Sequence, residues 1–191
     1  MMEMNTPLKF KVSNLSVHDI VLIPLLSASL TAGKMALSFI PNVEIVTLLF
    51  MVYASVFGFK KTFLVSIIFS TIEIFLYGLQ TWLIGYYILW PLLIFLSAML
   101  YKKTQSEWPF AFLALTFGLC FGLFFAMIES IFYGFSYGIV YWLRGIPFDV
   151  VHGASNFVLG IFLYRPLENL LSLLRDKYAF QHAIQNSCKT Q

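Results

Sequence analysis

Charged residues are scarce in this sequence of 191 residues. They make up 11% of the chain, against 60% hydrophobic residues, and the mean hydropathy is +0.83. A soluble domain carries about 25% charged and 45–50% apolar residues, so the composition excludes a soluble globular protein, a disordered chain and a nucleic-acid-binding module. At about 20 apolar residues per membrane-spanning helix, we expect six spans with short loops and no room for an ATPase, kinase or other water-soluble domain.

Cysteine is scarce as well, and the sequence has no nucleotide-binding motif. The two cysteines, Cys120 and Cys188, lie in an apolar run and in the polar C-terminal segment, so they form neither a pair motif nor a metal-ligand spacing. Gly33-Lys34 lacks the first glycine and the following Ser or Thr of a phosphate-binding loop. We therefore expect no metal and no cofactor, and the energy for any transport must come from another protein.

Apolar runs separated by polar residues, glycine and proline predict an all-α membrane protein with a single membrane domain. Ser16 and Asp19 form a capping-box pattern at the start of the first run. Turns are predicted at Gly58–Lys61 and at Gly78–Thr81, and a loop from Gly134 to Gly145. A separate amphipathic helix is predicted over about 166–180 along the membrane surface. The six predicted spans cover residues 17–39, 43–57, 62–77, 82–101, 110–133 and 146–164.

Lysine and arginine set the predicted orientation. Only Lys34 and Arg144 fall on one side of this topology. The other ten lie on the opposite side: Lys9, Lys11, Lys60, Lys61, Lys102, Lys103, Arg165, Arg175, Lys177 and Lys189. Cytoplasmic loops of membrane proteins carry an excess of basic residues, so both termini are predicted to be cytoplasmic, and the basic residues to contact lipid headgroups rather than nucleic acid.

Ionisable side chains inside spans are costly and are functional candidates by default. They are Lys34, Glu44, Glu73, Glu129, Asp149 and His152. In the predicted topology all of them lie in the outer half of the bilayer, while the inner half is apolar. A channel would need polar groups along its whole path. The pattern therefore favours a polar pocket that opens to the outside and is closed below.

Aromatic and polar residues at helical spacing extend this pocket. Trp82, Tyr86 and Trp90 recur every four residues and run too deep for an interfacial aromatic belt. Spacings of three and four put Asp149, His152 and Asn156 on one helix face. The predicted ligand-binding residues are Lys34, Glu44, Trp82, Tyr86, Trp90, Glu129, Tyr133, Asp149, His152 and Asn156. The alternatives are a hydrogen bond between Asp149 and His152, polar contacts between spans for the acids, and pairing of Lys34 with one of them.

Small residues mark a second face. Ala28, Ala32 and Ala36 recur every four residues, a spacing that lets another helix approach closely in lipid. Lys34 lies about 200° around the helix axis from Ala32, so the alanines face away from the predicted pocket. We expect them to dock a partner helix, and internal packing against another span is the alternative.

Two other functional classes compete. Gly134-Phe135-Ser136-Tyr137-Gly138 matches the G-x-S-x-G pattern of hydrolases, but that motif needs an α/β sheet, which is not predicted here. An intramembrane enzyme would need a nucleophile or a metal set facing water. A stand-alone secondary transporter would need polar groups in the inner half and often inverted repeats. We expect a protein that is not an enzyme.

Four stretches resemble the S components, the substrate-binding membrane subunits, of energy-coupling factor (ECF) vitamin transporters. They are Leu37-Ser38-Phe39-Ile40-Pro41-Asn42-Val43-Glu44, Val56-Phe57-Gly58-Phe59-Lys60-Lys61, Tyr86-Tyr87-Ile88-Leu89-Trp90-Pro91 and Gly145-Ile146-Pro147-Phe148-Asp149. The predicted six spans, cytoplasmic termini and alanine stripe agree with this family, and the likeness covers nearly the whole chain.

The resemblance implies a high-affinity capture subunit of an ATP-driven importer in a prokaryotic plasma membrane. Its partners would be a shared transmembrane subunit, docked on Ala28, Ala32 and Ala36, and two cytoplasmic ATPases. The substrate, a water-soluble vitamin or precursor, would be held by the fourth to sixth spans, capped by the loop 39–43 and released inside when the subunit topples. Stacking on aromatic rings favours a small heteroaromatic such as hydroxymethylpyrimidine or pyridoxine, with pantothenate or another vitamin as the alternative.

Overall fold

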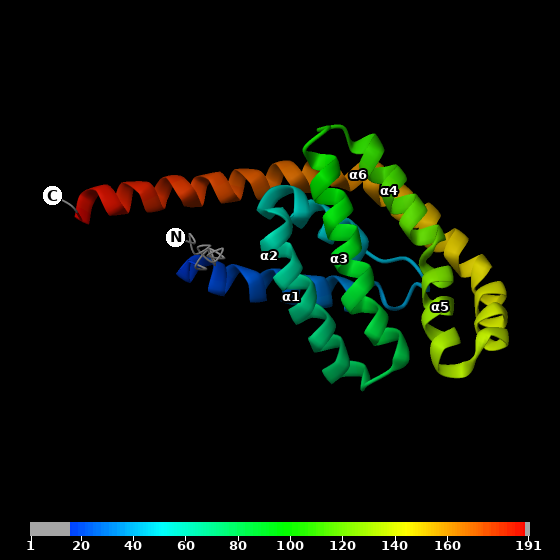
Figure 1. The fold of residues 1–191 in the computed structure, drawn as a ribbon. Coiled ribbons are helices and arrows are strands. Elements are labelled where there is room, and N and C mark those ends of the chain that lie inside the picture. The colour runs from blue at the N-terminus through cyan, green and yellow to red at the C-terminus, as the bar shows by residue number, and fades with distance from the viewer. Residues whose placement is uncertain (1–15, 190–191) are drawn as a thin grey trace, which may run out of the picture.

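The computed structural model describes residues 16–189, with the side chains of residues 16–178. Every element in this part of the chain is an α-helix, as Figure 1 shows. The helices are α1 Val17–Leu37, α2 Val46–Tyr77, α3 Thr81–Tyr101, α4 Glu107–Leu119, α5 Phe121–Tyr133 and α6 Phe135–Lys189. Lys9 and Lys11, and the side chains of Cys188 and Lys189, lie outside the described residues.

Five helical stretches of the described chain are long and apolar enough to cross a membrane. They are Val17–Leu37, Val46–Tyr77, Thr81–Tyr101, Glu107–Tyr133 and Phe135–Tyr178. By length and composition the chain is therefore a multi-pass α-helical membrane protein, as predicted. Six separate spans and cytoplasmic termini stay predictions.

The start of α1 follows the predicted capping box. The Ser16 side chain accepts a hydrogen bond from the Asp19 backbone N–H, and the Asp19 carboxylate accepts one from the Ser16 N–H, each at 3.2 Å. Two of the N–H groups that a helix start leaves unpaired are thereby satisfied. Asp19 also forms an ion pair with Lys61, whose Nζ lies 2.6 Å from its Oδ1, so the first turn of α1 is tied to the region just after Gly58.

The helix α2 is two arms joined at Gly58. Gly58 has φ 80° and ψ 169°, a conformation that favours glycine because it has no Cβ. The ring centroids of Phe50 and Phe69 are 5.7 Å apart, although 19 residues of straight helix would separate them by about 28 Å. The chain therefore folds back at Gly58, as predicted, although Phe59, Lys60 and Lys61 are helical rather than part of a longer turn.

The region predicted as a loop from Gly134 to Gly145 is helical instead. Only Gly134, with φ 90°, interrupts the chain, and α6 begins at Phe135. Gly138 packs so closely against α5 that an added Cβ would lie 2.7 Å from the Ala126 carbonyl oxygen. Gly138 therefore serves close helix packing, which small residues permit in membrane helices, whereas Gly145 has open space around it and simply continues the helix.

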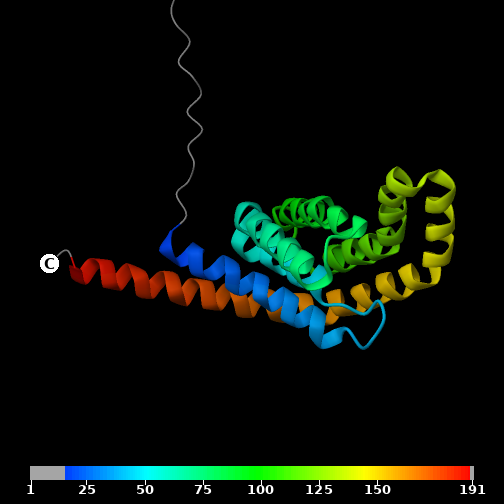
Figure 2. The same ribbon diagram turned by 90° about the horizontal axis from the view of Figure 1, so that it is seen from below.

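The predicted start of a separate helix at Pro166 is also wrong, because α6 runs through Pro147 and Pro166. The position of this part of the chain along the membrane surface stays a prediction. Figures 1 and 2 show α6 bending after it leaves α5 and then continuing as one ribbon past the bundle. Hydrogen bonds hold the part after Pro166: the Tyr101 hydroxyl donates to Glu168 at 3.1 Å and Arg175 donates to the Val56 carbonyl at 2.8 Å. These contacts offset the backbone hydrogen bond that proline removes.

The span predicted over 110–133 is likewise divided, into α4 and α5 at Cys120. Close packing then sets α6 against α4. An added Cβ on Gly118 would lie 2.7 Å from the Cα of Gly153, and one on Gly160 would lie 2.9 Å from the Cα of Ala111. Small residues at both crossings let the two backbones approach closely, and this fixes which face of α6 is turned toward the rest of the bundle.

Candidate functional site

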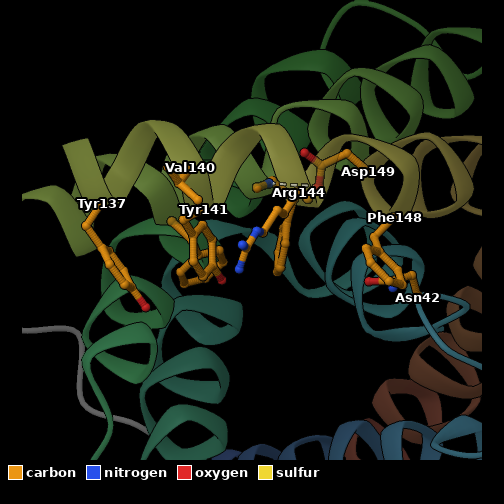
Figure 3. A pocket seen from close by; sticks show the side chains of 11 residues that line it. Asn42, Tyr137, Val140, Tyr141, Arg144, Phe148 and Asp149 are labelled. Atoms are coloured by element: carbon orange, nitrogen blue, oxygen red, sulfur yellow. Dashed lines mark hydrogen bonds between the residues drawn. The ribbon is translucent and has the colours of Figure 1, made fainter. Parts of the chain in front are cut away.

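Two adjoining cavities lie where the segment 38–45 meets α3, α5 and α6. The large cavity has a volume of about 500 Å³ and lies mainly between α5 and α6 (Figure 3). The small cavity has a volume of about 300 Å³ and lies beneath the segment 38–45, against α3. Asn42 and Phe121 line both, so the two cavities share a boundary.

The aromatic stripe of α3 forms the wall of the small cavity. Tyr86 and Trp90 line it and are buried, and their ring centroids are 5.2 Å apart. Trp82 stacks edge-on against Tyr86 at 5.2 Å and lines neither cavity. The Nε1 of Trp90 has no hydrogen-bond partner among the described residues. A buried N–H of this kind is costly unless an acceptor reaches it.

Glu44 joins the segment before α2 to α6. His152 Nε2 lies 3.2 Å from Glu44 Oε1, and the Asn156 side chain donates to the same oxygen at 3.3 Å. The second oxygen accepts the Thr47 backbone N–H at 2.9 Å, which joins Glu44 to the first turn of α2. Glu44 and His152 both line the small cavity. The alternative hydrogen bond between Asp149 and His152 does not form. Asp149 accepts from the Gly122 N–H, and His152 contacts Glu44.

Asp149 is held in the large cavity by α5. Its Oδ1 accepts the Gly122 backbone N–H at 3.0 Å, while its Oδ2 is buried and has no partner among the described residues. A Cβ on Gly122 would collide with this carboxylate. Gly122 is therefore a site residue that the sequence reasoning missed, because a glycine in an apolar run gives no signal beyond helix packing.

Lys34 pairs with an acid, the arrangement proposed as the alternative to ligand contact. Its ammonium forms an ion pair with Glu73, which is completely buried. The Nζ lies 4.8, 5.3 and 5.5 Å from the ring centroids of Tyr77, Tyr86 and Trp82, within the range of cation–π attraction. Lys34 also lines the small cavity. It is therefore the member of the ion pair that borders the space a ligand would occupy.

Two other predicted residues lie apart from the cavity linings. Glu129 is buried and accepts a hydrogen bond from the Thr81 hydroxyl at 2.5 Å, so it joins α5 to α3. Tyr133 is 59% exposed, and its ring lies 5.0 Å from that of Tyr137. These contacts are interhelical, which is the alternative considered for the acids.

Arg144 and the tyrosines before it are the main addition from the structure. Tyr137, Tyr141 and Arg144 line the large cavity, and in Figure 3 all three extend from α6 toward the same space. Their spacing of four and three residues puts them on one face of a helix. Sequence reasoning placed them in a loop, where spacing carries no such information, so Arg144 was used only as a topology signal.

The alanine stripe of α1 faces outward. Ala28, Ala32 and Ala36 are all exposed, and the same face carries exposed Leu25 one turn earlier and exposed Val21 two turns earlier. The stripe therefore does not pack inside the described bundle, and its side chains are smaller than those on the rest of the face.

No family model, curated protein or solved structure matches this chain. Within residues 16–178 no group of three or more His, Cys, Asp and Glu side chains is placed to hold a metal ion.

Proposed function

We propose that this chain is the substrate-capture subunit, or S component, of an ECF importer for a water-soluble vitamin or vitamin precursor. One observation carries the proposal: Lys34, Glu44, Trp90, Asp149 and His152, from four different parts of the chain, meet around two adjoining cavities. A mostly apolar concavity with a few convergent polar groups is the usual form of a small-molecule site.

The packing around Trp90 supports capture rather than conduction. Phe50, Phe69 and Phe117 pack against its indole, with ring centroids 5.1, 6.3 and 5.7 Å away. All three are buried, and Phe69 lines the small cavity itself, so these rings form an apolar layer at one wall of the small cavity. An ion or proton path would need polar groups through this layer. A binder of this kind must change its orientation or rely on a partner to deliver its cargo.

The exposed alanine face of α1 supports a partner subunit. A helix surface of small side chains allows the close backbone approach that drives helix association in lipid. In the proposal this surface docks the shared transmembrane subunit, two cytoplasmic ATPases supply the energy, and the cavities open to the outside.

The dimensions of the small cavity suit a small ligand. Tyr86, Trp90 and Phe121 line it, and aromatic faces favour stacking on a flat ring. Hydroxymethylpyrimidine and pyridoxine are candidates of this size, and pantothenate is the alternative.

The test is purification and reconstitution of the full chain. Protein purified from a host that carries ECF subunits should bring down two ATPases and a transmembrane subunit, and mass spectrometry should find a vitamin released on denaturation. Proteoliposomes with all the subunits should take up that vitamin only when ATP is inside. Uptake by the chain alone, driven by an ion gradient, would instead identify a secondary transporter and refute the proposal.

A further inference from the structure

One face of α6 presents a cationic group to the large cavity. Tyr137, Tyr141, Arg144 and Phe148 are spaced at four, three and four residues, and all of them line the cavity. Figure 3 shows the Arg144 guanidinium extending from α6 into the open space beside Tyr141. Within residues 16–178 the structure gives Arg144 no hydrogen bond and no ion pair. A guanidinium offers five donors in a planar fork that matches a carboxylate or phosphate.

The same cavity contains a buried acceptor. Asp149 is 8% exposed, and its Oδ2 has no hydrogen-bond partner in the described part of the chain. Its other oxygen is fixed by the Gly122 N–H, so the side chain is already positioned. A buried carboxylate oxygen left without a donor is costly, and a hydroxyl, amide or amine of a ligand would satisfy it.

These two groups define complementary ends of one ligand. We propose that the large cavity binds a small organic anion, with its carboxylate or phosphate held by Arg144 and the tyrosine hydroxyls, and with an adjacent hydroxyl or N–H group donating to Asp149. The rest of the molecule extends into the small cavity across the boundary at Asn42 and Phe121. This inference rests on the proposed function and chooses among its substrates. Pantothenate and a phosphorylated ring vitamin fit the charges, whereas neutral hydroxymethylpyrimidine and pyridoxine leave Arg144 unpaired.

A headgroup contact is the competing role for Arg144, because arginines near the end of a membrane helix can extend to lipid phosphates. The position of the residue argues against it. Arg144 is exposed, but it lines a cavity of about 500 Å³ whose lining also includes Asp149 of α6 and Phe121 and Phe125 of α5. A lipid-facing arginine would have no reason to share a concave site with a buried carboxylate.

Matched ligand pairs test the inference on the full chain in detergent at pH 7. The probes for calorimetry are pantothenate against pantothenol, pyridoxine 5′-phosphate against pyridoxine, and nicotinate against nicotinamide. In the wild type, one anion should bind at least about 10-fold more tightly than its neutral partner, the range of a charge-assisted pair. Arg144→Gln should abolish that preference by weakening the anion alone, and Arg144→Lys should keep part of it.

Lys103→Gln is the matched control, because it removes one positive charge from an exposed position outside both cavities. It should leave every affinity unchanged. Mass spectrometry of the small molecules and lipids released from wild-type and Arg144→Gln protein would detect ligands other than the six probes. The small molecule released from the wild type should be an anion at pH 7.

The outcomes are distinct. A tightly bound molecule that is neutral or cationic overturns the inference and leaves the capture function standing. An anion whose affinity survives Arg144→Gln also overturns it, as does a loss confined to bound phospholipid, which would assign Arg144 to headgroups. If no probe binds and no small molecule is released, the proposed function fails, and the inference fails with it.

Discussion

His152 Nε2 lies 3.2 Å from Glu44 Oε1, across 108 residues of sequence. This contact ties the segment 38–45, which covers the small cavity, to α6. The Ser155 hydroxyl adds a second tie by donating to the Asn42 carbonyl at 3.2 Å. The segment is therefore fastened at two points on the helix that lines both cavities.

We expect His152→Ala to loosen this segment and weaken substrate binding. Without the imidazole, Glu44 keeps only Asn156 and Thr47 as partners, so amide hydrogen exchange over residues 38–45 should rise. The dissociation constant should increase at least about 10-fold, or 1.4 kcal/mol. Glu107→Gln is the control, because Glu107 lies near Arg165 and lines neither cavity. Unchanged exchange in His152→Ala would mean that the contact does not hold the segment.

Gly122 should act through Asp149. In Gly122→Ala the new methyl group must displace the carboxylate that it meets, so we expect weaker substrate binding, by about 10-fold or more. A double-mutant cycle with Asp149→Ala measures the coupling. The double variant should bind no more weakly than Asp149→Ala alone. If the two losses simply add, Gly122 affects binding by another route.

Ala32→Trp should separate capture from transport. The indole would hold a partner helix away from α1 and remove the close contacts that small residues permit, but it would point away from both cavities. Ligand affinity of the isolated protein should stay near the wild-type value, while uptake into proteoliposomes with the partner subunits should fall to background. Leu25→Trp is the control, because Leu25 lies on the same face but its side chain is already large and exposed. This variant should reduce uptake less than Ala32→Trp does. Wild-type uptake by Ala32→Trp would exclude the stripe as the docking surface.

Orientation is open to cysteine labelling in a Cys120→Ser, Cys188→Ser background. Lys60→Cys and Lys103→Cys, both exposed, should react with a membrane-impermeant thiol reagent only from the cytoplasmic side. Phe135→Cys, at a position 75% exposed, should react only from outside. Labelling of Lys60→Cys from outside would reverse the topology and turn the cavities toward the cytoplasm.

Helix caps, turns and helix boundaries could be predicted from the sequence because each depends only on neighbouring residues. The capping box needs only Ser16 and Asp19, the turn at Gly58 needs one residue with positive φ, and the boundaries of α3 follow from one uninterrupted apolar run. The membrane class follows from composition alone, since so few charges and so many apolar residues need lipid as a solvent. Periodicity also put Lys34 and the alanine stripe on different faces of one helix.

Partner choice between helices was decided only by the tertiary structure. Periodicity shows which residues share a face, but not which face of another helix will meet it. The only protein partner considered for His152 was therefore Asp149 on its own helix, as the alternative to ligand contact, and not Glu44. For the same reason the sequence did not predict that Arg144 lines a cavity. Gly138 and Gly145 suggested a loop, whereas close packing of α5 on α6 makes a glycine necessary at 138 and lets the helix continue. Only a continuous helix puts Arg144 in the same cavity as Asp149, because the direction of a side chain depends on the helix that carries it.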